Sequence, residues 1–207
     1  MQRFFQNVSV KTIISGSLAC FALLIALVAS LGYVVGIMGE DAIDKWSLTA
    51  SRLDLMRGAD RSRLNTMVQI DDLARMRESG PVDDAEQKKR LLEIDQLIEE
   101  ANGRVTKAKA MPLPEDPHDA ELVSRSLAYY EQSMNVLEEQ HSAIRSGDKE
   151  ALTRARYEMS HVLTPKMRPV FDETFNSLLA HGRERVANFK AALSKAATWG
   201  VLALLLS

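Results

Sequence analysis

The sequence predicts an all-α fold, an antiparallel up-down four-helix bundle flanked by transmembrane helices. A long uncharged apolar segment lies near the N-terminus, and apolar residues in the rest of the chain recur at steps of three and four. No segment alternates apolar and polar residues as a half-buried strand would. Charge is confined to the middle of the chain, because every charged residue except Arg3 and Lys11 lies between residues 40 and 195.

The first predicted element is a transmembrane helix over residues 12–38, preceded by a cytoplasmic tail over residues 1–11. Its apolar run, Ile13–Met38, exceeds the about 20 residues that a helix needs to span a bilayer and the apolar part of a cleaved signal peptide. Arg3 and Lys11 precede this run, and acidic residues follow it. Because the basic flank of a membrane helix stays in the cytoplasm, we expect residues 39–195 to lie in the periplasm of a bacterium.

The segment 196–207 is uncharged and apolar but too short to cross a bilayer as a helix. Trp199 lies where an interfacial aromatic side chain would be found. We interpret this segment as the start of a second, truncated transmembrane helix in the bacterial inner membrane, which would place whatever follows it in the cytoplasm.

Gly- and Pro-containing breakers divide residues 39–195 into four helices: Ser79-Gly80-Pro81, the prolines at 112, 114 and 117, and Ser146-Gly147-Asp148. The first helix continues from the membrane and ends at about Glu78. The second starts at Asp83, with Glu86 three residues on in the spacing of a capping box. The third starts near Asp119, and the fourth follows the Gly147 turn.

Apolar residues at steps of three and four mark the faces that we expect to form the core of the bundle. On the second helix they are Leu91, Ile94, Ile98, Ala101 and Val105. On the third they are Val123, Leu127, Tyr130, Met134, Leu137, His141 and Ile144. On the fourth they are Phe175, Leu179, Val186, Phe189 and Leu193.

Charged residues interrupt the apolar face of the first helix. Arg57, Arg61 and Asn65 are spaced by four, so they share one side of the helix. Two arginines at this spacing repel each other slightly, but an anion between them makes the arrangement favourable because guanidinium groups bind carboxylates in a bidentate way. The alternative is a solvated face whose arginines pair with acids such as Asp54 or Asp60.

The fourth helix has its own irregularity at Thr164-Pro165. Proline removes a helical hydrogen bond and disfavours helical geometry in the preceding residue, so we expect an exposed Thr164 hydroxyl and a local polar site; the alternative is a plain kink. Tyr157 and His161 share the face of Thr164 by their spacing and are further candidates. Helical rise places Asn65 and Thr164 at nearly the same level below the two hairpin turns, so both could line one pocket for a small anion.

Three stretches carry a family resemblance: Ala110-Met-Pro-Leu-Pro, the pair Tyr129-Tyr130, and Thr164–Phe175, which ends in Glu-Thr-Phe. In their order and spacing, the chain resembles the sensor region of bacterial methyl-accepting chemotaxis proteins of the aspartate/serine-receptor type. The resemblance implies a homodimer that binds its ligand between the subunits, near the end of the bundle far from the membrane. It also implies a signal through the second membrane helix to a cytoplasmic histidine kinase complex that controls chemotaxis.

The resemblance also implies site residues. In that family an arginine followed four residues later by an asparagine holds the ligand from the first helix, and Arg61 and Asn65 fit this pair. A threonine next to a proline contacts the ligand from the fourth helix, and Thr164 is similar to it.

This chain departs from the family's amino-acid receptors, which carry further arginines on the first helix where it has Thr66 and Ile70. We therefore expect the ligand to be a small carboxylate, an organic acid rather than an amino acid. Arg57 or Arg63 would supply the second positive charge.

Other functions stay open. The same sensor module could serve a histidine kinase or a nucleotide cyclase, or the bundle could be structural and bind nothing. A di-metal helical-bundle enzyme is a further alternative, because Glu138-x-x-His141 and Glu158-x-x-His161 have the spacing of ferritin-like sites.

Composition excludes several classes. The net charge of −2 argues against a nucleic-acid partner, since phosphate binding needs a basic surface. A single Cys excludes a disulfide framework and a Cys-based metal site. Because the sequence holds no nucleophile–base arrangement, phosphate loop or nucleotide motif, we expect no enzymatic activity, no metal and no cofactor.

Overall fold

The structure, a computed structural model, describes residues 10–205, without the side chains of residues 10–13, 20 and 203–205. This range contains helices and turns and no strand, which confirms the all-α prediction. The elements are α1 (Val10–Ser79), α2 (Asp84–Ala110), α3 (Pro117–Ser146), α4 (Lys149–Tyr157), the π-helix η1 (Glu158–Leu163) and α5 (Thr164–Leu205). Because α4, η1 and α5 follow one another directly, they form the predicted fourth helix.

The chain divides into two compact units. The first unit comprises residues 1–46 and 182–207, so its described part contains the start of α1 and the end of α5. Aromatic rings lie against glycines here: Phe189 lies against Gly39, and Trp46 lies against Gly182. Any larger residue at these two glycines would meet the ring opposite.

The beginning of α1 has the length and composition of a membrane span. The helix Ile14–Ser79 contains a window of mean hydropathy 2.6 and is the one candidate span among the described residues. Apolar side chains such as Leu18, Leu23 and Tyr33 are more than half exposed, as a lipid-facing surface requires. Most of the predicted tail, residues 1–9, lies outside the described residues, as do residues 206–207 of the predicted second span.

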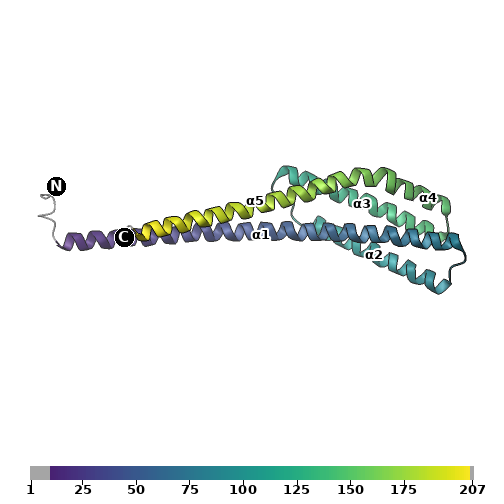
Figure 1. Cartoon of the computed structure of the whole chain (residues 1–207), viewed down its shortest axis with the longest axis horizontal. Helices are drawn as coiled ribbons and strands as arrows, with labels where there is room; N and C mark the ends of the chain where they lie inside the picture. The colour runs from purple at the N-terminus through teal and green to yellow at the C-terminus, as the bar shows by residue number, and fades with distance from the viewer. Residues whose placement is uncertain (1–9, 206–207) are drawn as a thin grey trace. The chain divides into compact units, whose positions relative to one another are not determined.

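The second unit, residues 47–181, is the four-helix bundle, in which α2, α3 and the α4–η1–α5 run lie alongside α1 (Figure 1). Tyr130 of α3 lies at its centre with no exposed surface. Its hydroxyl donates to the backbone oxygen of Met56 at 2.7 Å, and its ring stacks on Phe171 with centroids 4.2 Å apart. Burial raises the pKa of Tyr130, so the phenol stays a donor.

Capping residues mark the beginnings and ends of helices at the positions that the sequence predicts. Asp83 and Asp148 cap α2 and α4, each accepting a hydrogen bond from the backbone N–H three residues on. Gly147 ends α3 at φ +76°, in the left-handed region that favours glycine. The start of α3 differs from the prediction: it begins at Pro117 rather than near Asp119, because Asp116 is the cap and proline fits the first turn.

The core face of α3 is confirmed, since all seven predicted residues are buried. The face predicted for the fourth helix is only partly right: Phe175 and Leu179 are partly buried against the core, whereas Leu193 is 48% exposed. The buried residues of this helix in the bundle are Leu152, Ala155, Met159, Leu163, Met167, Val170, Phe171, Thr174 and Leu178. A polar residue hides this pattern in the sequence, because Thr174 is fully buried and satisfies its hydroxyl on Ser126 and on the backbone oxygen of Val170.

The irregular turn lies before the prolines rather than at them. In η1 the N–H of Thr164 donates to the backbone oxygen of Met159, five residues back. Pro165 has no N–H, so the carbonyl of His161 cannot receive a normal helical hydrogen bond. The helix continues through Pro169 without a break. The predicted break at Thr164-Pro165 is therefore a widened turn over residues 158–163.

Candidate functional site

The candidate face of α1 is exposed to solvent. Arg57, Arg61 and Asn65 are all exposed, as their common spacing predicts. The guanidinium of Arg57 lies 5.3 Å from the centroid of the Phe175 ring, a cation–π contact with α5. Within residues 10–205, no hydrogen bond or ion pair involves the side chains of Arg61 and Asn65.

Arg63 faces the interior, unlike its neighbours. It is 5% exposed, and its Nη2 lies 2.7 Å from Oδ1 of Asp60. Its Nη1 also contacts the sulfur atoms of Met67 and Met159. Asp60 is therefore paired with Arg63. It does not neutralise Arg57 or Arg61, as the alternative interpretation of this face required.

Thr164 stands at the junction between η1 and α5. Its side chain is half-buried, and its Oγ1 atom is buried with no hydrogen-bond partner in the described chain. The prediction of an exposed hydroxyl is therefore wrong for this single chain, because the helix stays closed around the prolines. A buried hydroxyl without a partner is uncommon and costs free energy.

Tyr157 and His161 lie together on the outer surface. Their rings stack with centroids 4.5 Å apart and planes 13° apart, and both side chains are exposed. The hydroxyl of Ser160 lies 2.8 Å from Nδ1 of His161, which fixes the orientation of that ring. The structure thus brings these two candidates together, as their spacing predicts.

Two contacts set the level of the fourth helix against α1. Arg156 Nη2 lies 2.6 Å from Asp71 Oδ1, and Arg63 Nη1 lies 3.9 Å from Met159 Sδ. Since the helices are antiparallel, Thr164 lies about 7 Å from the Met159 level toward the membrane-proximal end, by helical rise. That is less than one helical turn from the level of Arg61 and about 10 Å from the level of Asn65, with which the sequence predicts Thr164 to be level.

The two Glu-x-x-His pairs do not converge. His141 is buried, with Nδ1 3.4 Å from Asp95, whereas Glu138 accepts a hydrogen bond from Asn102. Burial lowers the pKa of His141, Arg145 adds to this effect, and Asp95 opposes it. His161 is exposed beside Tyr157. These surroundings do not form the shared four-carboxylate centre that a di-metal site needs.

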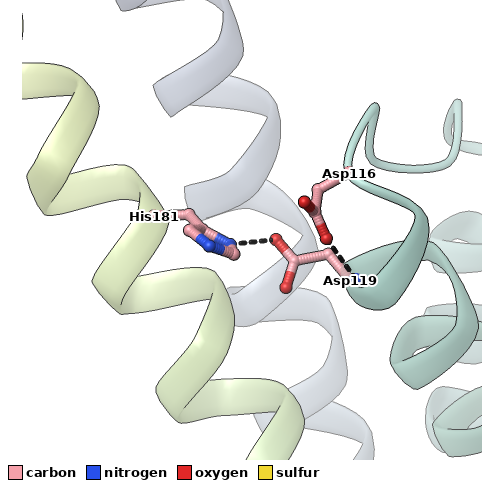
Figure 2. A group of neighbouring side chains, drawn as sticks. All are labelled: Asp116, Asp119 and His181. Atoms are coloured by element: carbon pink, nitrogen blue, oxygen red, sulfur yellow. Dashed lines mark hydrogen bonds and ion pairs between the residues drawn. The ribbon is translucent and has the colours of Figure 1, made fainter.

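A different cluster escapes sequence reasoning. Asp119 is 3% exposed at the start of α3, and its carboxylate accepts a 2.6 Å hydrogen bond from Ser177 of α5. The same carboxylate lies 2.7 Å from Nδ1 of His181, also on α5 (Figure 2). Asp116 completes the cluster, and the backbone N–H of Asp119 donates to it and lowers its pKa. The positive N-terminus of α3 favours these carboxylates rather than a cation. Ser177 and His181 lie 58 and 62 residues from Asp119 along the chain, so no local sequence pattern indicates this cluster.

Comparison with known proteins identifies the family. Residues 4–185 match the family described as Tar ligand binding domain homologue. No curated protein and no solved structure gave a significant match. The family match agrees with the helical bundle and with the apolar start of α1. The chain therefore belongs to the Tar ligand binding domain homologues, the helical sensor domains of aspartate/serine-type chemotaxis receptors, which are not a catalytic family.

Proposed function

We propose that this chain is the sensor region of a transmembrane chemoreceptor that binds a small organic acid between two copies of itself. The binding residues are Arg61 and Asn65 on α1 and Thr164 on α5. Arg57, Tyr157 and His161 border this site. The sensor lies in the periplasm of a bacterium and is anchored in the inner membrane, because the basic flank of the apolar helix precedes it.

The observation that carries the proposal is the exposed face of α1. Arg61 and Asn65 have no partner in the described chain, yet they stand beside Leu64 and Val68, which are 46% and 56% exposed. Apolar side chains in a row beside an unpaired guanidinium favour a covered surface over a solvated one. A second copy packed on this face would bury the apolar residues and leave a positively charged gap for an anion.

Thr164 supports the position of the site. Its Oγ1 is a buried hydroxyl oxygen without a partner, and a ligand or a small repacking on dimerisation would satisfy it. Its level on the fourth helix is close to that of Arg61, so both residues can reach one small molecule.

The residues around Arg61 favour an organic acid over an amino acid. Thr66 and Ile70, which stand where the resemblance places further arginines, are fully buried and cannot contact a ligand at the surface. Arg63 is occupied by Asp60. The unpaired charges that α1 carries at Arg57 and Arg61 are cationic and favour an anion.

The signal would pass along the fourth helix. α5 runs without interruption from Thr164 to Leu205, so a displacement at Thr164 is carried along one helix. A ligand can shift such a helix only by binding one of its positions more tightly than the other. In this proposal the output is a cytoplasmic histidine kinase complex that controls chemotaxis.

Calorimetry tests the input. The chain in lipid nanodiscs is titrated with malate, citrate and benzoate, and one of these acids is expected to bind. Arg61→Gln should weaken that binding by about 10- to 100-fold, since a charge-assisted bidentate contact is lost. Arg154→Gln removes an exposed arginine of α4 that has no side-chain partner in the described chain and should leave binding unchanged. Equal affinities for both variants would refute the site.

A chimera tests the output. Residues 1–195 are joined to the second membrane span and the cytoplasmic part of a chemoreceptor, and kinase activity is measured with and without the acid that binds. A change in kinase activity that Arg61→Gln abolishes supports the proposed direction of signalling. If the acid binds but kinase activity does not change, the proposed binding site stands and the proposed transmission through α5 is refuted.

A further inference from the structure

A cavity of about 370 Å³ opens to solvent on one chain of the bundle, between α1, α3, α4 and η1. Its volume is in the range of sites for small metabolites. It lies farther from the membrane-proximal end than Arg61, because its α1 wall extends from Met67 to Glu78. No residue of the proposed acid site lines it.

The charges that line this cavity balance. Asp71 and Arg156 already form an ion pair at 2.6 Å. Arg75 and Glu78, both exposed and three residues apart on α1, have no partner in the described chain. The cavity therefore offers one unpaired guanidinium and one unpaired carboxylate, which complement an anion and a cation held close together.

The rest of the wall is suited to an apolar group. The thioether side chains of Met67 and Met159 line it, and methionine adapts to apolar ligands of irregular shape. The guanidinium of Arg63 contacts both sulfur atoms and fixes these side chains from behind. Gln140, 2% exposed, donates from Nε2 to the backbone oxygen of Ala155 and adds an ordered polar residue to the wall.

We propose that this cavity binds a compact zwitterion, an α-amino acid with an apolar side chain. Arg75 would hold the carboxylate, Glu78 the ammonium group, and the partly buried Met67 the apolar side chain. A simple organic acid fits less well, because it would leave the Glu78 carboxylate without a positive partner. This cavity thus offers both charges, whereas the site at Arg61 offers only positive charge, and its lining comes from one chain.

The position of the cavity gives such a ligand a route to the signalling helix. Met159 and Ser160 belong to η1, and π-turns are frequent at functional sites because the extra residue loosens the hydrogen-bond ladder. A zwitterion between α1 and η1 would stabilise one arrangement of this turn, directly before Thr164.

The test uses the full chain in lipid nanodiscs and four probes. L-leucine and L-methionine carry both charges, isovalerate carries only the carboxylate, and isopentylamine carries only the ammonium group. By calorimetry, at least one amino acid should bind about tenfold or more tightly than either single-charge probe. No amino acid binding at concentrations up to about 10 mM, or equal binding of isovalerate, would overturn the proposal.

Variants separate this site from the acid site. Arg75→Gln and Glu78→Gln should each weaken amino acid binding by about tenfold, and both side chains are exposed, so the bundle should keep its fold. Arg154→Gln and Glu139→Gln are matched controls on exposed positions without a side-chain partner in the described chain. Arg61→Gln should not affect the amino acid. If Arg61→Gln abolishes amino acid binding and Arg75→Gln does not, the ligand binds at the proposed acid site instead.

Discussion

The substitution Ser177→Ala tests how α3 is held against α5. The Ser177 hydroxyl donates to Asp119 at 2.6 Å, and Asp119 is only 3% exposed, so water cannot easily replace the lost donor. A hydrogen bond to a charged group contributes about 1.5–3 kcal/mol. We therefore expect the free energy of unfolding to fall by about 2 kcal/mol, which lowers Tm by about 6–8 °C for a bundle of this size.

Urea and thermal unfolding of the chain, followed by circular dichroism, measure this loss. Ser124→Ala is the control, because its hydroxyl is exposed and bonds only to its own helix at Ala120; it should change stability by about 0.5 kcal/mol or less. In an Asp119→Ala background, Ser177→Ala should cost about as little as the control, since its partner is gone. A Ser177→Ala variant as stable as Ser124→Ala would refute the reasoning that this carboxylate needs both donors.

Three further predictions concern the bundle. Burial lowers the pKa of His141 below its ordinary value, so the unfolded chain binds a proton more readily than the folded one. The free energy of unfolding should therefore fall as pH drops through about 6.5. His141→Leu should reduce this dependence on pH, measured by urea unfolding at several pH values. Gly147→Ala should cost about 1 kcal/mol, because alanine is strained at φ +76°, and an unchanged Tm would contradict this. Tyr130→Phe should cost about 1–2 kcal/mol by leaving the Met56 carbonyl without its donor, measured by urea unfolding against Tyr129→Phe.

Short-range signals explain most of the fold that the sequence predicts. The caps at Asp83 and Asp148 and the stop at Gly147 act within one turn of the chain, so the residues alone specify them. The core face of α3 can equally be predicted, because apolar residues occupy every one of the seven predicted positions except His141. The face of the fourth helix can be predicted only in part, because Thr174 is polar and yet buried.

Only part of the candidate site could be predicted from the sequence, for the same reason. Helical spacing places Arg57, Arg61 and Asn65 on one face, and the structure finds them exposed together. Spacing does not tell that Arg63, two residues from Arg61, turns inward to Asp60, because that choice depends on Met159 from another helix. The buried Thr164 hydroxyl likewise follows from the packing around η1 rather than from the prolines beside it.

The amino-acid sequence by itself determined the helical class, the apolar segment at the start, the ends of the helices and the common face of the three α1 residues. These properties depend on neighbours within a few positions along the chain, where backbone geometry is fixed by residue type. Only the tertiary structure decided the register of the fourth helix, the widened turn at η1, the Asp119 cluster and the cavity beside Arg75. Each of these depends on side chains from helices far apart in sequence, whose contacts exist only once the bundle has packed.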